Sequence, residues 1–342
     1  MTHYHLNFSK NNTNLLGPMS IQGVIRIIAT TILSVILFHQ SNGQQGPQWT
    51  QYAFNQYLIN PAYGGLDRSL SITAGIRSQW SPFPGAPRSQ MITGHLPLYF
   101  LNGSAGMTLL NEELGVFRRT GVSLGYNYVV DSPLGLFSTG FRVGVQQISL
   151  RNEDITTPSG SYIDQSIDHN DPRLNNVNLS GYAPTWSLGM YYIKDLLEIG
   201  ISVDNPANTV EAGSSTFNED LIFSIYGSYQ YPISELLAME PNVFVKTDGK
   251  QTQVDIGVLG YYSQFIGGMS LRGYNANSID ALGFIAGVKV SKHVRISYSF
   301  DLGISGFRTF HDGTHEFLIN YNLSKPIRTG ELPRIIYNPR YN

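Results

Sequence analysis

The chain has 342 residues, of which 13% are charged, and it is rich in Gly (35), Tyr (21) and Phe (17), a composition that favours strands and turns over helices. The formal charge of -2 and the lack of a Lys/Arg cluster argue against nucleic acid as a partner. Because there is no Cys, thiol catalysis, Cys-type zinc sites, disulfides and a lipidated N-terminal cysteine are excluded. No linker divides the chain, so one large all-β domain is expected.

The N-terminal part carries the only long apolar run, Ile27–Phe38, which follows Arg26 and precedes the polar stretch SNGQQ. This run is too short to span a bilayer. A basic residue, an apolar run and small residues are typical of a secretory signal peptide, here cleaved near Gly43–Gln45. We therefore expect residues 1–44 to be a signal peptide, and a retained anchor is the competing interpretation. A start of translation at Met19 would give a signal peptide of more ordinary length.

Beyond residue 67, apolar and polar side chains alternate with a period of two. In Leu70–Arg77 the residues Ile72, Ala74 and Ile76 interleave with small or polar ones, and residues 121–128, 141–146, 253–258 and 294–301 repeat the pattern. We count about fourteen such segments between Arg68 and Lys325, an even number that suits a membrane barrel. The pattern predicts a transmembrane, antiparallel, up-and-down β-barrel over residues 68–325, preceded by a short N-terminal periplasmic segment. A soluble β-sandwich would show the same alternation.

Connection lengths distinguish the barrel from the sandwich. The long connections, residues 78–88, 151–182, 205–218 and 303–312, all follow odd-numbered strands. Short turns at residues 131–135, 193–196, 231–235 and 291–293 follow even-numbered strands. Outer-membrane barrels have long extracellular loops and short periplasmic turns. This parity therefore predicts an integral outer-membrane protein with its loops at the cell surface and its termini in the periplasm.

Aromatic residues stand near the predicted periplasmic strand ends, where a membrane barrel has its interfacial girdle. These are Tyr99, Phe100, Tyr126, Tyr128, Tyr191, Tyr192, Tyr229, Tyr231, Tyr261, Tyr262 and Tyr321. Charged residues fall instead on the face predicted to line the lumen, namely Arg77, Arg142, Asp255, Lys289, Arg295, Asp301 and Glu316. Because buried charges need partners, we expect these side chains to form an ion-pair network inside the barrel.

The stretch between signal and barrel, PQWTQYAFNQYLINPAYGG (Pro47–Gly65), carries a recognisable motif together with Arg77, Gln79 and Trp80. Three parts match a pattern of the form P-x-(F/W)-(S/T)-Q-Y-x-x-N, then N-P-A-Y-x-G, then R-x-Q-W. The matching residues are Pro47, Trp49, Thr50, Gln51, Tyr52, Asn55, Asn60, Pro61, Ala62, Tyr63, Gly65, Arg77, Gln79 and Trp80. The chain thereby resembles the PorP/SprF family, and it departs from the family only at Ala53 and Gln56, where Met and Pro are common.

The resemblance implies an outer-membrane component of the type IX secretion system of Bacteroidota. Its partners would be outer-membrane lipid, a large secreted adhesin or its C-terminal domain, and other secretion components such as the periplasmic ring. Some members of the family are linked to gliding motility. A passive porin or a transporter of small solutes is the alternative function.

Residues 45–67 are expected to form either a plug, with Trp49, Tyr52, Phe54 and Tyr57 packed in the barrel mouth, or a periplasmic cap. Asn60-Pro61 and Gly64-Gly65 read as a turn that leads into the first strand. The first loop, residues 79–88, combines Trp80 and Phe83 with three prolines. Such a stiff aromatic loop suits a protein-binding edge, and closure of this loop over the lumen is the alternative. The candidate partner-binding residues are Trp49, Tyr52, Phe54, Asn60, Pro61, Tyr63, Trp80 and Phe83.

The loop 151–182 holds Asp164, Asp168 and Asp171, hard oxygen ligands suited to calcium. Their spacing matches no EF-hand-like template, so a solvated acidic loop competes with a calcium site. Adjacent Asp168-His169 and His311-Asp312 lack a nucleophile elbow or zinc motif. We therefore predict no enzymatic activity and no cofactor. The last residues, 326–342, with Pro333, Pro339 and three arginines, are expected to form a periplasmic tail that contacts other machinery.

Overall fold

The structure is a computed structural model. It describes residues 48–150, 160–161, 170, 180–205, 210–212, 215–217, 220–275, 278–304 and 312–324. The expected signal peptide, the calcium candidates Asp164, Asp168 and Asp171, and the expected tail lie outside these residues. Within the described ranges, no helix is both long and apolar enough to cross a membrane.

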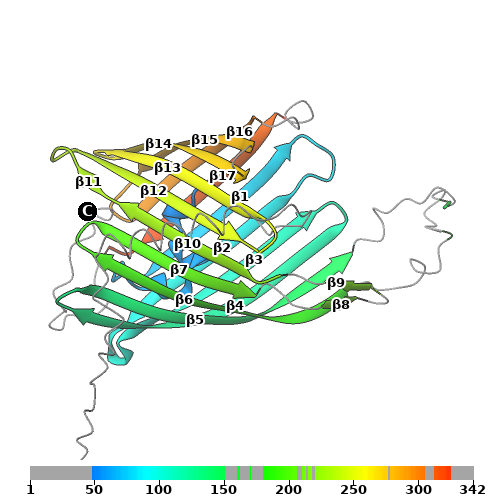
Figure 1. Ribbon diagram of the computed structural model, residues 1–342, viewed down its shortest axis with the longest axis horizontal. Helices are drawn as coiled ribbons and strands as arrows, with labels where there is room; N and C mark the ends of the chain where they lie inside the picture. The colour runs from blue at the N-terminus through cyan, green and yellow to red at the C-terminus, as the bar shows by residue number, and fades with distance from the viewer. Residues whose placement is uncertain are drawn as a thin grey trace, which may run out of the picture. The chain divides into compact units, whose positions relative to one another are not determined.

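The strands form one closed antiparallel β-barrel (Figure 1). The sheet has fifteen strands, of which the two-residue β11 (Tyr231–Pro232) pairs only with β12, so fourteen strands build the wall. The pairing of the first strand, β1, with the last, β17, closes the barrel, and β10 pairs with β12, the next wall strand along the chain. The wall consists of β1 (Ser71–Ser81), β2 (Arg88–Leu98), β3 (Gly103–Leu114), β4 (Phe117–Ser132), β5 (Gly135–Leu150), β6 (Ser180–Lys194), β7 (Leu197–Asn205), β10 (Ile222–Tyr229), β12 (Leu237–Thr247), β13 (Thr252–Tyr262), β14 (Phe265–Asn275), β15 (Ser278–Lys289), β16 (Val294–Gly303) and β17 (Gly313–Asn322). The predicted antiparallel β-barrel of about fourteen strands is confirmed.

Two further strands lie in the connection between β7 and β10. β8 (Val210–Ala212) and β9 (Ser215–Phe217) pair with each other and form a separate two-stranded sheet. They belong to one of the connections predicted to be long. All four predicted long connections leave the same end of the barrel, after β1, β5, β7 and β16, and we call this the long-loop end. The short turns after β4, β6, β10 and β15 leave the other end, the short-turn end.

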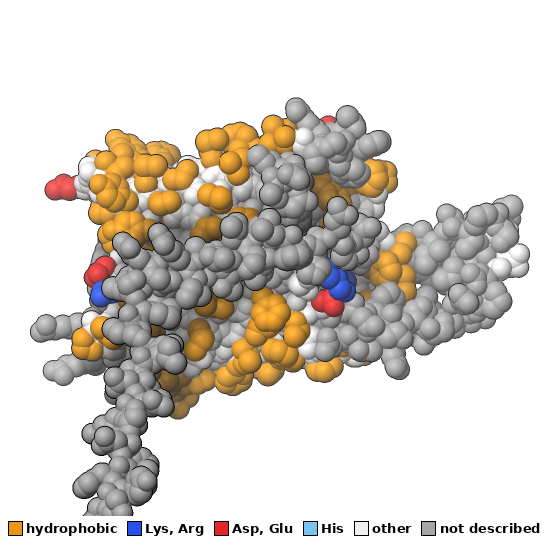
Figure 2. Space-filling view, viewed as in Figure 1, with side chains coloured by type: hydrophobic (Ala, Val, Ile, Leu, Met, Phe, Trp, Pro, Cys, Tyr) orange, Lys and Arg blue, Asp and Glu red, His pale blue; other side chains and the backbone are white. Residues whose placement is uncertain are grey.

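The alternation of side chains sets which face of each strand is buried. In β1, Ile72 and Ile76 are exposed on the outside, while Ser71, Thr73 and Arg77 are buried inside. In β5, Val143 is exposed and Arg142 is buried. This inverts the arrangement of a soluble protein, and Figure 2 shows apolar side chains over the outer surface of the wall. An apolar outside and a polar inside suit a barrel that crosses a membrane.

The predicted aromatic girdle is correct in part. Tyr128, Tyr229 and Tyr262 are exposed on the outer face near the short-turn end. Tyr191 and Tyr261, however, are buried inside the barrel. The prediction was wrong for these two because neighbouring strand residues point to opposite faces, so only one tyrosine of each Tyr-Tyr pair can face outward.

Candidate functional site

The barrel interior is occupied by residues 48–67, which we call the lumen segment (Figure 1). It contains three short helical turns, η1 (Tyr52–Phe54), α2 (Gln56–Ile59) and η2 (Pro61–Tyr63). Its aromatic residues are buried, among them Tyr57 at 1% exposure. Short helical turns satisfy part of the segment's own backbone, and the barrel wall has to satisfy the rest, because an unpaired buried backbone group is costly.

The N-terminal part of the lumen segment is fixed by carboxylates of the wall. The backbone N–H groups of Thr50 and Gln51 each donate to a carboxylate oxygen of Glu316, at 2.9 Å in both cases. The Thr50 hydroxyl donates to Asp301, at 2.6 Å and 2.8 Å from its two oxygens. Both carboxylates are almost completely buried. This is a charge-assisted anchor between residues more than 250 positions apart.

Two arginines neutralise these carboxylates and complete a buried charge cluster. Arg77 lies 2.9 Å from Asp301 and 2.8 Å from Glu316, its partner directly across the β1–β17 pairing. Arg272 lies 2.9 Å from Asp255 and 3.2 Å from Asp301. The cluster therefore confirms the predicted interior network for Arg77, Asp255, Asp301 and Glu316. Arg272 belongs to the same cluster and was missed, because its partners depend on strand register, which the sequence does not reveal.

Two of the other predicted lumen charges, Arg142 and Arg295, contact the lumen segment. Arg142 donates to the backbone carbonyls of Tyr57 and Leu58 and pairs with Asp204 at 3.2 Å. Arg295 donates to the Phe54 carbonyl at 3.1 Å, and its guanidinium lies 4.4 Å from the centre of the Phe54 ring. These arginines replace the solvent that free carbonyls would need. Lys289 lies half-buried on the same inner face.

The turn at Asn60–Pro61 is fitted closely to β4, β5, β6 and β7. The Asn60 side chain donates to the carbonyls of Met190 and Ile201, both at 3.0 Å, and accepts from Ala62 N–H at 2.9 Å. Pro61 occupies the first turn of η2, where its missing N–H costs nothing. Gly140 makes room for this turn, since a Cβ there would lie 2.8 Å from the Ala62 backbone. The C-terminal part of the lumen segment is therefore held by packing as well as by hydrogen bonds.

Aromatic rings link the middle of the lumen segment to β6, β10 and β12. Tyr52 stacks on Phe244 with ring centres 5.0 Å apart, and Tyr63 meets Tyr191 edge to face at 5.2 Å. Gln56 donates to Glu198 at 3.0 Å and to the Tyr226 hydroxyl at 2.9 Å. Edge-to-face and offset rings are favourable pairings. The segment is thus bonded to strands all around the barrel.

The segment ends near the short-turn end, where the chain turns into β1. Gly65 N–H donates to His95 Nδ1 at 3.1 Å, and Asp67 lies 3.7 Å from the same nitrogen. Burial raises the pKa of the Asp67 carboxyl, against the opposing influence of His95. The entry to the first strand is therefore buried and hydrogen-bonded.

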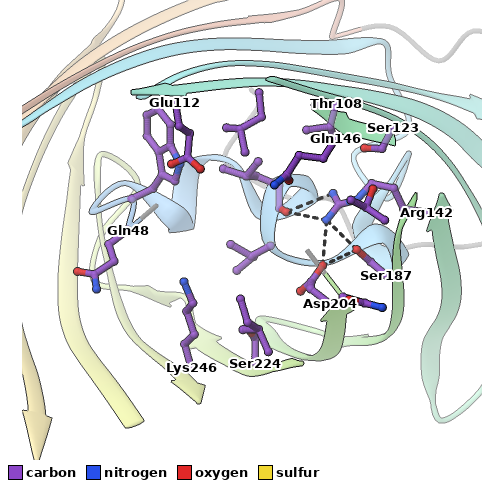
Figure 3. Close-up of a pocket in the computed structure, with 18 of the residues that line it drawn as sticks. Gln48, Thr108, Glu112, Ser123, Arg142, Gln146, Ser187, Asp204, Ser224 and Lys246 are labelled. Carbon is purple, nitrogen blue, oxygen red and sulfur yellow. Dashed lines mark hydrogen bonds and ion pairs between the residues drawn. The ribbon is translucent and has the colours of Figure 1, made fainter. Parts of the chain in front are cut away.

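A cavity of about 210 Å³ lies beside the lumen segment, among residues from the long-loop halves of the strands (Figure 3). Trp49, Tyr52, Leu58 and Ile59 of the lumen segment line it on one side. Polar wall residues surround it, and Figure 3 shows the Lys246 and Glu112 side chains extending into the hollow. The sequence prediction did not single out these wall residues, although their places on the polar face of alternating strands offered a signal.

The candidate partner-binding residues fall into two groups. Trp49, Tyr52, Phe54, Asn60, Pro61 and Tyr63 are buried in the lumen. Trp80, in the last turn-side residues of β1, and Phe83, in the connection between β1 and β2, lie at the long-loop end, where Phe83 is 40% exposed. Trp80 has a left-handed backbone (φ 53°) and donates its N–H to Thr314 at 3.2 Å. Partner binding by either group remains a prediction. Among the residues that the structure describes, no group of His, Asp or Glu side chains is arranged to hold a metal ion.

A family model described as "Type IX secretion system membrane protein PorP/SprF" matches residues 41–321. The chain belongs to this family. The resemblance carried by Pro47–Gly65 and Arg77–Trp80 is thereby confirmed over most of the chain. A PorP/SprF barrel with an apolar outer belt is an outer-membrane protein, so the predicted outer-membrane localisation is confirmed, and the orientation of its loops and termini stays a prediction.

Two solved outer-membrane proteins are similar to this PorP/SprF chain at low sequence identity. The outer membrane protein Omp33 of Acinetobacter baumannii has 7% identity and a TM-score of 0.45, over 75% of this chain and 100% of its own. The toluene transporter TbuX of Ralstonia pickettii has 10% identity and a TM-score of 0.46, over 78% of this chain and 92% of its own. No curated protein matches the chain.

Proposed function

We propose that this PorP/SprF barrel binds a large secreted surface protein of the type IX pathway, such as an adhesin, and anchors it or assists its export. The observation that carries the proposal is the filled lumen. Residues 48–67 lie inside the barrel and bond to carboxylates, arginines and amides of the wall. A barrel whose interior is taken up by its own chain is better suited to holding a partner at its ends than to passing solutes.

The ends of the barrel offer the surfaces for such a partner. Recognition residues are commonly carried by loops on a rigid scaffold, and the long connections gather at one end of this one. Phe83 is exposed there, next to Trp80. In an outer-membrane barrel the end with long connections faces the cell surface, which is where a displayed adhesin resides. The periplasmic ring would be reached from the short-turn end.

The alternative, a passive porin or small-solute transporter, is favoured by the cavity beside the lumen segment. Its lining is largely apolar but includes the charged side chains of Glu112, Arg119 and Lys246, which a solute path would need. Conductance separates the two functions. We expect the purified protein in planar bilayers to show little steady conductance, and an open, ohmic pore would favour the porin.

Affinity purification tests the main proposal. The tagged protein is isolated from gently solubilised outer membranes of its own host, and co-purified proteins are identified by mass spectrometry. Recovery of a large surface protein together with other type IX components supports the proposal. Recovery of the barrel alone, combined with steady conductance, refutes it.

A pair of variants locates the contact. The double variant Trp80→Ala, Phe83→Ala removes aromatic contacts at the long-loop end, and Phe100→Ala removes one at the short-turn end, where Phe100 is 73% exposed. We expect the first to lower the yield of the surface protein and the second to leave it unchanged. The reverse result would move the binding surface to the short-turn end.

A further inference from the structure

The outer face of the barrel wall carries an open groove of about 630 Å³. Its apolar floor is a row of outward residues that face one another across β2, β3, β4 and β5, namely Ile92, Leu109, Val122 and Val145. The outer face of a membrane barrel is surrounded by lipid. Ligand pockets commonly measure roughly 300–1,000 Å³, so the groove has room for a bound molecule with an apolar chain.

The groove becomes polar toward the long-loop end. The next row of outward residues that face one another is Gln90, Asn111, Thr120 and Gln147, and all four line the groove. Asn111 Oδ1 accepts from the Thr120 hydroxyl at 3.0 Å and from Arg118 Nε at 3.1 Å. On β10 and β14, by contrast, the exposed outward residues of the long-loop half include Phe223 and Leu271. The polar row is therefore a local feature of β2–β5.

Charged residues form the row nearest the long-loop end. Glu113 on β3 faces Arg88 on β2 and Arg118 on β4. Both arginines are exposed, and within the described ranges neither guanidinium has a carboxylate at ion-pair distance. A guanidinium has five N–H donors, so the bond from Arg118 to Asn111 leaves others for a ligand. The row holds two cations against one carboxylate and is positive overall.

The three rows follow the order of the parts of a phospholipid. Alternate residues of a strand lie about 7 Å apart, so the charged row stands roughly 13 Å from the apolar floor. Phosphate, ester groups and acyl chain succeed one another in the same order. Arginine suits the head group, because its planar fork matches phosphate oxygens. A free phosphate would leave the apolar floor uncovered, and an uncharged lipid would leave the arginines without an anion.

We propose that this groove binds a lipid with a phosphate head group. The phosphate lies between Arg88 and Arg118, the ester groups bond to the row that contains Asn111, and an acyl chain lies along Leu109 and Val122. The site lies on the membrane face of the wall and needs no secreted protein. It is therefore independent of the partner named in the proposed function.

The lipid selectivity of the purified full-length protein provides the test. Native mass spectrometry from detergent measures binding of dioleoylphosphatidylglycerol and of dioleoylglycerol, which has the same chains without phosphate. Glycerol phosphate, which has no chains, is added as a competitor. Each basic residue near a membrane surface contributes about fivefold in affinity for an anionic lipid. With one net positive charge, we expect the phosphate lipid to bind about fivefold more tightly than the uncharged lipid, and glycerol phosphate to displace neither.

Charge variants assign the head group. Arg88→Gln and Arg118→Gln should each abolish the preference for the phosphate lipid, whereas Glu113→Gln should raise it to roughly 25-fold. Lys194→Gln is the matched control, because Lys194 is an exposed cation at the short-turn end, and it should leave the preference unchanged. If an arginine variant does not fold, Glu113→Gln still tests the charged row, since its effect has the opposite sign.

A second pair of variants tests the groove itself. Ala74 lines the groove and is exposed, so Ala74→Phe should fill part of it and weaken both lipids severalfold. Ala286→Phe makes the same change at an exposed outward position of β15, outside the groove. We expect it to leave both affinities unchanged.

Four results would overturn the inference. Equal affinity for the two lipids, or a preference that the arginine variants do not change, would mean that only annular lipid is bound. Displacement by glycerol phosphate would mean that the arginines hold free phosphate. Equal effects of Ala74→Phe and Ala286→Phe would remove the groove from the site. If Ala74→Phe leaves lipid binding intact but prevents recovery of the surface protein from the host, the groove belongs to a protein partner; the proposed function then stands and the lipid inference falls.

Discussion

The buried charge cluster gives the sharpest prediction about how the lumen segment is held. In Arg77→Met the guanidinium that bridges Asp301 and Glu316 is lost, while both carboxylates stay buried. Breaking a buried ion pair by removing one partner costs about 3–5 kcal/mol. Arg272 still lies 3.2 Å from Asp301, and two backbone N–H groups still donate to Glu316. We therefore expect a value at the lower limit of this range, a fall of about 3 kcal/mol in the free energy of unfolding.

The assay is urea unfolding of the protein folded into lipid vesicles. Arg118→Met is the control, because Arg118 is exposed and donates to Asn111 at 3.1 Å, and we expect a change within about 0.5 kcal/mol. A double-mutant cycle with Thr50→Val should give a coupling of about 0.5–3 kcal/mol, since Thr50 contacts the same carboxylate. If Arg77→Met costs less than about 1 kcal/mol, the cluster is not a buried clamp and this reasoning fails.

Three further predictions test the fit of the lumen segment and the nature of the outer face, all by the same unfolding assay. Gly140→Ala should lower the free energy of unfolding by about 1–3 kcal/mol, because the added Cβ meets the Ala62 backbone. Gly267→Ala is the control and should leave it unchanged, because a Cβ there has no atom within 4 Å. Equal effects of the two variants would refute the tight fit. Asn60→Ala should lower the free energy of unfolding by about 1–3 kcal/mol, because two wall carbonyls lose their hydrogen-bond donor. An unchanged free energy of unfolding would mean that water replaces the Asn60 amide. Val143→Lys, in the middle of β5 on the exposed face, should cost about 2–4 kcal/mol in lipid; a neutral result would mean that this face lies outside the bilayer.

The wall of the barrel was predictable from the sequence because its signal is local. Alternation in Leu70–Arg77 already predicts which side chains face outward, and the burial of Ser71–Arg77 in β1 follows it residue by residue. The even strand count and the side on which each long connection falls follow from simple counting along the chain. These features require only that each strand keeps its period of two, which a closed membrane barrel enforces.

The interior could not be predicted to the same depth because its contacts are distant in sequence. Thr50 and Glu316 are 266 residues apart, and nothing local indicates that they meet. The sequence analysis did not predict that Arg272 belongs to the charge cluster, since its position opposite Asp255 depends on the register of β13 and β14. Tyr191 was placed on the wrong face because the period of two was not applied to the aromatic pairs. Register and closure are global properties, and a single sequence shows them poorly.

The structure also suggests what the three parts of the family motif have in common. Thr50 and Gln51 from the first part meet Arg77 from the third around Glu316. Asn60 and Pro61 from the second part form the turn that fits against β6 and β7. Each part therefore fixes the lumen segment inside the wall.

A motif that builds the interior is available to every member of a family, so it cannot distinguish one partner from another. Trp49, Tyr52, Phe54 and Tyr63 reach a partner only from within the lumen, because the wall encloses them. Selectivity for one partner protein has to come from residues outside the motif, either at the long-loop end or around the cavity, which Lys246 and Gln146 line. Exchanging the connection between β1 and β2 with that of another family member should then transfer partner choice and leave stability unchanged. If partner choice instead follows residues 48–67, the lumen segment leaves the barrel when it binds.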